Sequence, residues 1–423
     1  MFHLSKIFES PADHHYFFGY FNTAQISIDS QRILALRVKS IGTVPGPSDT
    51  AEVGWFSLFS DSNHFHKIGE TNAYNWQQGA MLQFLGPDYK DQICWNFFDG
   101  LSYKTRIHDF RSNSSRVVPA IYNPSPKGDV AVTIDFERHA WCRRGYSYGN
   151  VMLGSKNKAI VDGDAIWLVN MRTSEKMELI TLKELLKFNS LSTMNGATHY
   201  LEHSTFSPSG NQIAFLHRWK HSNGIHSRFF VINTDGSNLQ VINDSGRMSH
   251  FCWYSESKLL GYGGKSNPFN SLRKNKTFVK SLFKILLPIY KKFVHDSSGI
   301  GKALTGDGYY LFDIDNNNSH KPIVPSLRSE DGHPIMLHDK RYFLTDTYAR
   351  SEFGQLPTLL LGDLETGQST LLATLNSIDR YDETPLRCDL HPCLSPCGTI
   401  ISIDTMDGGK RRVFAYRLER TDV

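Results

Sequence analysis

A short unit that joins a turn to an apolar run recurs along this chain of 423 residues, and it constrains the fold more than any other feature. Its clearest copy is Glu202 to Trp219, EHSTFSPSGNQIAFLHRW, in which a Ser-Pro-Ser-Gly turn leads into the apolar run Ile213 to Leu216. Proline presets the backbone of such a turn, and glycine supplies an angle that other residues rarely adopt. The unit therefore predicts a chain reversal into a buried strand.

Seven segments follow this pattern. In four of them a histidine stands ten residues before a buried strand position, which pairs His203 with Ile213, His250 with Leu260, His333 with Phe343 and His391 with Ile401. Three others lack the histidine: Ile28 to Val38, Asp88 to Asn96, and Asn123 to Ile134. Self-similarity at a period of tens of residues is typical of solenoids and propellers.

Seven such units predict an all-β fold, a seven-bladed β-propeller of four-stranded sheets. Second apolar runs that end in Asp-rich turns, such as Phe229 to Ser237, are interpreted as hairpins within these sheets. The run Arg411 to Leu418 is expected to pair with the N-terminal strand near Phe2 to Phe8 and so to close the ring. We expect one propeller domain over residues 1–423, with a pair of β-sandwiches as the alternative.

Two segments have helical periodicity. Leu182 to Phe188 is predicted to be a short helix in a loop. The second, Arg273 to Val294, lies in an expected insertion at about 266–300 and is amphipathic, with lysines on one face and Phe, Leu and Ile on the other. Three alternatives stay open for it: a helix laid on the propeller, peripheral contact with an anionic membrane surface, or contact with a partner protein.

Composition excludes some classes of function. A formal net charge of +4, without a zinc-finger or RNP motif, argues against nucleic-acid binding. No span has the length of a membrane helix, and the N-terminus lacks the apolar core of a signal peptide, so a cytoplasmic location is expected, with possible attachment to the inner membrane face. Six cysteines without a CxxC motif are expected to be reduced thiols.

The four recurring histidines form the first candidate site. Positions just before the innermost strands of a propeller face its central channel, so His203, His250, His333 and His391 are expected to converge there. Converging imidazoles suit a divalent metal cofactor such as Zn²⁺, Mn²⁺ or Ca²⁺. The alternative is a structural role, in which each histidine caps a strand turn.

The second candidate is Asp135 to Gly149, DFERHAWCRRGYSYG, which is predicted to be a loop at the channel mouth after an inner strand. Guanidinium groups bind carboxylates in bidentate geometry, and a neighbouring histidine or tyrosine can transfer a proton. This combination suits an acidic sugar. The catalytic candidates are His139, Arg143, Arg144, Tyr146 and Tyr148. The alternative is a solvated loop whose tyrosines pack on a blade.

The third candidate would bind substrate and comes from the segment Asn72 to Gln83 and the next strand. Trp76 offers a stacking face for a sugar, and nearby amides offer paired donors and acceptors. The amides are Asn75, Gln77, Gln78 and Asn96, and Arg218 in the opening unit joins this set. An inter-blade polar network is the alternative. The chain has no phosphate-binding loop or dinucleotide fingerprint.

Five stretches carry a family resemblance. They are HHYFFGYFN, NWQQGAMLQFL, FERHAWCRRGYSYG, the opening unit and RCDLHPCLSPCGTIISIDT, which together run from near the start of the chain to near its end. The chain resembles the seven-bladed propeller polysaccharide lyases that include the ulvan lyases and, more distantly, oligogalacturonate lyase. Asn75 and Asn96 stand where the family pattern leads us to expect lyase histidines, and an amide cannot exchange protons.

The resemblance implies a lyase that cleaves next to a uronic acid by β-elimination. In that reaction the carboxylate is neutralised, the C5 proton is removed and the leaving oxygen is protonated. By similarity, Tyr146 or Tyr148 would be the acid or base, and Arg143 or Arg144 would hold the carboxylate. An acidic oligo- or polysaccharide is the expected partner. The alternative is a non-catalytic propeller that binds glycan or protein at the cytoplasmic membrane face during surface-polysaccharide production.

Overall fold

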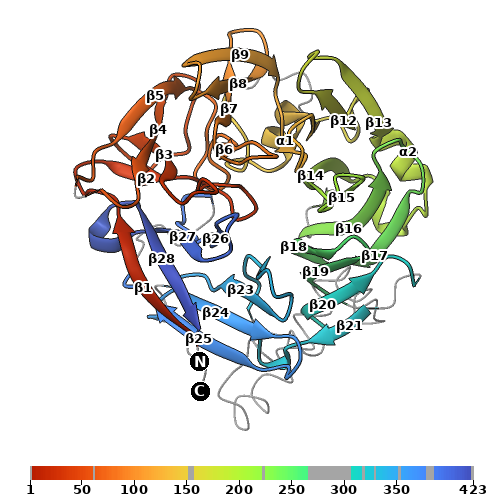
Figure 1. Cartoon of the computed structure of the whole chain (residues 1–423). Coiled ribbons are helices and arrows are strands. Elements are labelled where there is room, and N and C mark those ends of the chain that lie inside the picture. The colour runs from red at the N-terminus through yellow and green to blue at the C-terminus, as the bar shows by residue number, and fades with distance from the viewer. Residues whose placement is uncertain are drawn as a thin grey trace.

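The protein is built from seven four-stranded antiparallel sheets arranged radially around one axis (Figure 1). The all-β, seven-bladed propeller predicted from the repeats is therefore confirmed. The computed structural model describes residues 2–60, 62–150, 157–221, 224–264, 306–316, 320–327, 330–350, 354–377 and 385–420. The predicted insertion at 266–300 and its amphipathic segment at 273–294 lie outside these residues.

Each blade begins with its innermost strand. Blade 1 comprises β2 (His15–Phe17), β3 (Arg32–Val38), β4 (Ala51–Ser57) and β5 (His66–Thr71). Blade 2 comprises β6 (Gln83–Phe84), β7 (Gln92–Phe98), β8 (Tyr103–Asp109) and β9 (Ser114–Pro119), and blade 3 comprises β10 (Asn123–Pro124), β11 (Val130–Thr133), β12 (Ala165–Asn170) and β13 (Lys176–Thr181). Blade 4 comprises β14 (Thr198–Phe206), β15 (Gln212–His221), β16 (Gly224–Asn233) and β17 (Gln240–Gly246).

The remaining blades follow the same order. Blade 5 comprises β18 (Met248–Ser255), β19 (Lys258–Gly263), β20 (Gly308–Asp313) and β21 (His320–Ile323), and blade 6 comprises β22 (Ile335–Met336), β23 (Tyr342–Asp346), β24 (Thr358–Asp363) and β25 (Ser369–Thr374). Blade 7 comprises β26 (Cys393–Leu394), β27 (Ile400–Thr405), β28 (Arg412–Arg420) and, from the other end of the chain, β1 (Phe2–Glu9).

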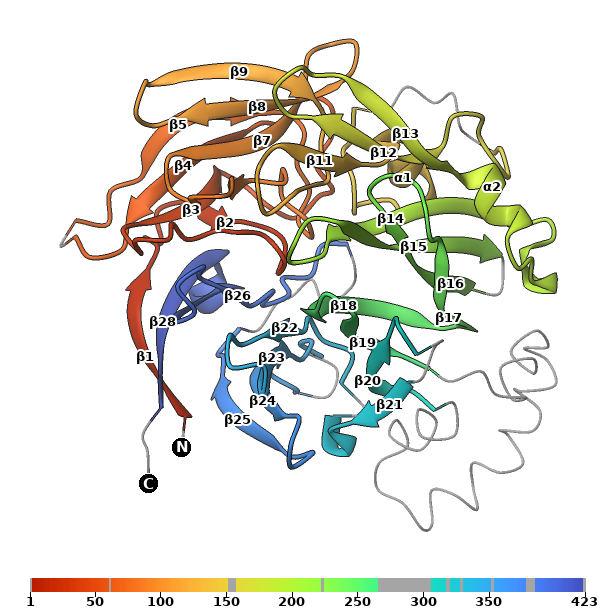
Figure 2. The same cartoon turned by 45° about the vertical axis from the view of Figure 1, so that its right-hand side comes forward.

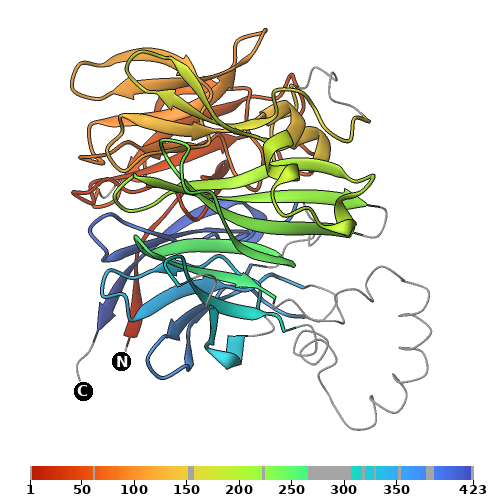
Figure 3. The ribbon, with the colours of Figure 1, turned by 90° about the vertical axis from the view of Figure 1, so that its right-hand side faces the viewer.

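The ring is closed by pairing between the two ends of the chain. β1 runs antiparallel to β28, from Phe2 opposite Arg420 to Glu9 opposite Phe414. Figures 2 and 3 show the two strands side by side at the edge of the disc. The predicted closure is confirmed, and it joins blade 7 to blade 1.

The strand that follows each Ser-Pro-x-Gly turn is the second of its blade. The strand before the segment 135–149, which was predicted to be an inner strand, is therefore β11, the second strand of blade 3. The turn after Phe206 joins β14 to β15. The innermost strands β6, β10, β22 and β26 have only two residues each, so they carry little periodic signal in the sequence. His333 and His391 lie shortly before the innermost strands β22 and β26, as predicted, whereas His203 and His250 lie within the innermost strands β14 and β18.

In the described ranges, two α-helices accompany the sheets. The predicted helix in the loop after β13 is present as α2 (Leu182–Lys187), where Thr181 and Glu184 form a capping box. The first half of the predicted loop at 135–149 is instead α1 (Phe136–Cys142), because the Asp135 side chain caps Arg138 N. Among the described residues, no helix is long and apolar enough to span a membrane.

The core lies between neighbouring blades. Ile213 and Phe215 pack into one apolar cluster, whereas Ala214 and Leu216 pack into another on the opposite face of the same sheet. Successive side chains of a strand point to opposite faces, and here both faces are covered. This is why the second strands read as continuous apolar runs rather than as alternating ones.

Leu216→Ala should therefore lower the free energy of unfolding by about 3 kcal/mol, because Leu216 is fully buried and the deletion leaves a cavity. Leu371→Ala is the matched control, since Leu371 is 57% exposed and its loss should cost less than about 1 kcal/mol. Chemical denaturation of the two variants measures both values. Equal losses would contradict this account of the core.

Candidate functional site at the channel

The four recurring histidines meet at the centre of the ring. Ring centroids of His203 and His250 lie 5.7 Å apart, those of His250 and His333 4.3 Å, and those of His333 and His391 4.2 Å. They come from blades 4, 5, 6 and 7 in turn. The structure thus brings together four side chains that are far apart in sequence, while their role as metal ligands stays a prediction.

The backbone at two of these histidines adopts an uncommon conformation. His203 has φ of 53° and His391 has φ of 44°, in the left-handed region that residues other than glycine rarely enter. His203 also falls where the register of β14 and β15 shifts, between Glu202 and Thr205. Such conformations persist only where surrounding contacts fix them, and they cluster at functional sites.

A cation-binding group can be built from three of the buried side chains. His333, Asp389 and His391 each offer one ligand atom, and these atoms lie within 4.8 Å of one another. His333 Nδ1 donates to the carboxylate of Asp346 at 2.9 Å, which leaves the lone pair of Nε2 available. Within the part of the chain that the structure describes, the buried Nδ1 of His391 has no hydrogen-bond partner. Two imidazoles and a carboxylate suit a borderline divalent ion such as Mn²⁺ or Zn²⁺.

The other two histidines have different partners. Nδ1 of His203 lies 2.6 Å from the hydroxyl of Tyr20, and its Nε2 lies 3.5 Å from Glu202 Oε1 and 3.4 Å from Arg143 Nη1. Both nitrogens of His203 are thus engaged by protein groups. His250 Nδ1 lies 3.2 Å from Asp331 Oδ1, which leaves Nε2 as its proton acceptor.

Two aromatic residues that the sequence analysis did not select fill the space between the histidines. The ring of Tyr20 lies 5.4 Å from that of His203 and 5.5 Å from that of His391, and Phe21 lies 5.2 Å from His333. Their segment was noted only within a family-like stretch, because blade 1 has no histidine in the repeat position.

This aromatic segment is anchored from two neighbouring blades. Asp404 of blade 7 accepts hydrogen bonds from Phe18 N and Gly19 N, at 3.2 and 3.3 Å. On the other side Gly19, with φ of 119°, approaches blade 2 so closely that a Cβ would lie 2.3 Å from Gly79 N. Only glycine permits this contact.

Glu202 is the electrostatic centre of the opposite wall, and sequence reasoning missed it. Its carboxylate is fully buried and accepts hydrogen bonds from Arg143 Nη1 at 2.8 Å and His139 Nε2 at 3.0 Å, and it pairs with Arg218. Burial alone would raise the pKa of Glu202, but Arg143 and Arg218 hold it well below its ordinary value. It precedes the histidine in only one copy of the repeat, so periodicity gave no signal.

Two further arginines, Arg218 and Arg387, also lie at this centre, and a guanidinium group can bind an anion. Arg218 is 8% exposed, and its Nη2 has no hydrogen-bond partner among the described residues. Arg387 Nη2 donates to Asp389 at 2.9 Å, and its guanidinium lies 4.0 Å from the ring centroid of Tyr348. Burial would raise the pKa of Asp389, but Arg387 lowers it strongly, so the carboxylate is ionised.

The residues predicted at 135–149 separate into three groups. His139 and Arg143 contact the carboxylate of Glu202. The ring of Tyr146 packs on Arg143, whose guanidinium carbon lies 3.6 Å from the ring centroid. Tyr148 is buried in the blade core, where its hydroxyl accepts from Asn96 Nδ2 at 2.9 Å. Arg144 is exposed and lines a separate cavity of about 310 Å³. These positions favour a packing role for Tyr148.

The predicted sugar-binding amides form a network inside the wall. Asn96 is fully buried and donates to Ile121 O at 2.8 Å. The side-chain oxygen of Asn75 accepts from the backbone N–H groups of Gln77 and Gln78. The Gln77 side chain donates to Arg387 O at 2.8 Å, and the Gln78 side chain donates to Tyr122 OH at 2.8 Å. The stated alternative, an inter-blade polar network, describes these amides better than sugar binding.

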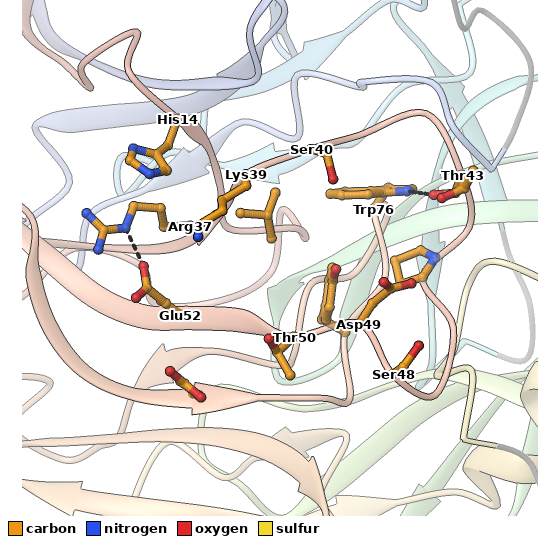
Figure 4. A pocket seen from close by; sticks show the side chains of 14 residues that line it. His14, Arg37, Lys39, Ser40, Thr43, Ser48, Asp49, Thr50, Glu52 and Trp76 are labelled. Carbon is orange, nitrogen blue, oxygen red and sulfur yellow. Dashed lines mark hydrogen bonds and ion pairs between the residues drawn. The ribbon is translucent and has the colours of Figure 1, made fainter.

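Trp76 lies outside the histidine cluster. Its indole N–H donates to the carbonyl of Thr43 at 2.7 Å, and the ring lines a separate cavity of about 400 Å³ (Figure 4). None of the four clustered histidines lines this cavity.

Comparison with solved structures shows the same fold in two lyases. An oligogalacturonate lyase in complex with manganese has a TM-score of 0.59 at 14% identity, over 99% of this chain and 96% of that one. An oligogalacturonate lyase from Vibrio parahaemolyticus gives 0.58 at 11%, also over 99% and 96%. The propeller domain of the trilobed protease from Pyrococcus furiosus gives only 0.47 at 9% identity, over 99% and 97%.

At these identities the likeness shows a shared fold. No protein-family model matches the chain, and no curated protein matches its sequence. The resemblance to ulvan lyases stays a prediction.

Glu202→Gln should lower the free energy of unfolding by about 3 kcal/mol, because Arg143 and Arg218 would keep buried positive charges without a counter-ion. Glu178→Gln, at an exposed position in β13, is the matched control and should change stability by less than about 0.5 kcal/mol. Urea denaturation measures both. A neutral effect of Glu202→Gln would mean that the arginines have other counter-ions.

Proposed function

We propose that this protein is a polysaccharide lyase-like enzyme that cleaves a uronic-acid-containing glycan by β-elimination at the histidine cluster. The observation that carries the proposal is the convergence at one point of a cation-binding group, a histidine with an available Nε2 and an arginine with an unpartnered Nη2. The fold shared with oligogalacturonate lyase along nearly the whole chain supports it.

Charge balance explains why a metal ion belongs to the proposal. The centre holds three guanidinium groups, Arg143, Arg218 and Arg387, and four carboxylates, Glu202, Asp331, Asp346 and Asp389. The protein alone would therefore carry an excess negative charge where an acidic sugar has to bind. A divalent ion held by His333, Asp389 and His391 would reverse this excess and, when bound, would help to neutralise the substrate carboxylate.

Three side chains of the protein would then have different roles in the elimination. Arg218 would bind the uronate carboxylate through its unpartnered Nη2 and orient the sugar. His250, with Nδ1 held by Asp331, would accept the C5 proton at Nε2. The electron pair of the C5–H bond forms the C4–C5 double bond as the C4–O bond breaks. Tyr146, half-buried on Arg143, would donate its proton to the leaving oxygen.

A non-catalytic protein that binds acidic glycan with the same groups is the alternative. A cytoplasmic location and peripheral membrane contact through 273–294 also stay proposals, because that segment lies outside the described residues. Liposome flotation of the full chain and of a 273–294 deletion tests the membrane contact. Equal recovery of the two proteins with anionic vesicles would refute it.

Acidic oligosaccharides of several kinds should be offered to the protein, with ultraviolet absorbance of the unsaturated uronate as the measurement. Loss of a general base typically costs 10²–10⁴-fold in rate, so we expect His250→Gln to slow elimination by roughly that factor and to retain substrate binding. His66→Gln, on the exposed side of β5, should leave the rate unchanged. Binding of a glycan without any absorbance change would favour the non-catalytic alternative.

The metal content of two variants distinguishes His391, a proposed ligand, from His203. Elemental analysis of the purified protein should find about one divalent ion per chain, which His391→Ala should remove, since it deletes one of the proposed ligands. His203→Ala should retain the ion, because both nitrogens of His203 already have protein partners. Equal metal loss in the two variants would place His203 among the ligands.

A further inference from the structure

A second cavity of about 400 Å³ lies on blade 1, between the ends of β3 and β4 and the segment that holds Trp76 (Figure 4). None of the four clustered histidines lines it. Its volume is within the range of pockets that enclose small ligands. It therefore has to be considered as a site of its own.

One wall of this cavity is aromatic and held in place. Tyr74 and Trp76 line it, with ring centroids 5.7 Å apart. The Trp76 indole is fixed by its hydrogen bond to Thr43 O, and the buried guanidinium of Arg411 lies 5.0 Å from its ring centroid. A ligand would meet a surface that needs no ordering on binding.

One end of the cavity offers fixed donors and acceptors. Arg37 Nε donates to Glu52 Oε2 at 2.5 Å, and Lys67 Nζ lies 3.0 Å from Glu52 Oε1, so this carboxylate is held from two sides. Figure 4 shows Arg37 and Glu52 at one end of the cavity and Asp49 nearer to Trp76. Asp49 itself accepts from Gly46 N at 2.7 Å. Two aromatic residues and fixed polar groups that line one cavity are suited to a sugar, which has apolar C–H groups as well as hydroxyl groups.

The charges of the cavity balance, unlike those of the histidine cluster. Arg37 and Lys39 line it together with three carboxylates, Asp49, Glu52 and Glu70. Lys67 pairs with both Glu52 and Glu70 from behind, which makes three cations against three anions. Such a site has no net attraction for a uronate. It favours an uncharged ligand.

The cavity adjoins the proposed catalytic cluster. Gln77, which follows Trp76, donates to Arg387 O at 2.8 Å, and Arg411 donates to Leu386 O at 2.7 Å. Arg387 in turn pairs with Asp389 of the cation-binding group. A single layer of side chains and backbone thus connects the wall of the cavity to the cluster.

We propose that this cavity is a subsite for a neutral sugar residue. In so far as that sugar belongs to the same glycan as the uronate at the histidine cluster, the proposal rests on the proposed function. The binding of a neutral monosaccharide does not require elimination, so the two can be tested separately.

The test is ligand-observed NMR with methyl glycosides of glucose, galactose, mannose, rhamnose and xylose, and with galacturonate and glucuronate. At least one neutral glycoside should bind with a Kd on the order of 1–10 mM. Ser40→Trp should weaken that binding at least about tenfold, because an exposed side chain on the cavity edge would then fill it. Ser190→Trp, at an exposed position after α2, is the control and should bind as the unsubstituted protein does.

Three results would overturn the subsite: no neutral glycoside binds, Ser40→Trp binds as well as the unsubstituted protein, or a uronate is the ligand that Ser40→Trp displaces. His391→Ala, which leaves the cavity intact, should retain neutral-sugar binding. If neutral sugars bind but no glycan is cleaved, the subsite stands and the lyase proposal fails. If glycans are cleaved but Ser40→Trp changes neither sugar binding nor the KM for long substrates, the subsite fails and the lyase stands.

Discussion

The pairing of β1 with β28 is the interaction on which the rest of the arrangement depends. It closes the ring and holds blade 7 against blade 1, and the proposed centre spans that junction. Asp404 of blade 7 binds the backbone of the segment that carries Tyr20, and Tyr20 in turn lies against His391. An open ring would separate these groups, so the site is a property of the closed propeller rather than of any one blade.

Buried charge at the centre is tolerated because each ionised group has several partners. Glu202 is shared by two arginines and a histidine, and Asp346 accepts from the backbone of both His333 and His391 as well as from the His333 ring. A buried ion pair stabilises a fold only when its remaining hydrogen-bonding capacity is satisfied. Here the remaining hydrogen bonds of Glu202 and Asp346 orient the imidazole rings of His139 and His333. The contacts that limit the cost of burying these carboxylates therefore also position the side chains of the site.

Sequence periodicity predicted the fold and the convergence of the histidines, because both follow from a repeat. It could not predict Tyr20 or Glu202, which occur in one blade each and act across the channel. Nor could it separate Tyr146 from Tyr148, since the packing of Tyr148 against Asn96 depends on a neighbouring blade. The repeat also misled in one respect: the strongest apolar signal came from the second strands, because the innermost strands β6, β10, β22 and β26 have only two residues each.

The amides of blade 2 show how a departure from the family pattern can be accommodated. Asn75 and Asn96 bond to backbone and to Tyr148 within the wall, and Gln77 bonds to the carbonyl of Arg387. Amides can donate and accept without carrying charge, so they support this wall at low electrostatic cost. The groups that can bind an ion or move a proton are contributed mainly by blades 4 to 7, on the other side of the channel. The proposed proton transfer depends on His250 and its partner Asp331, so the amides in blade 2 do not exclude it.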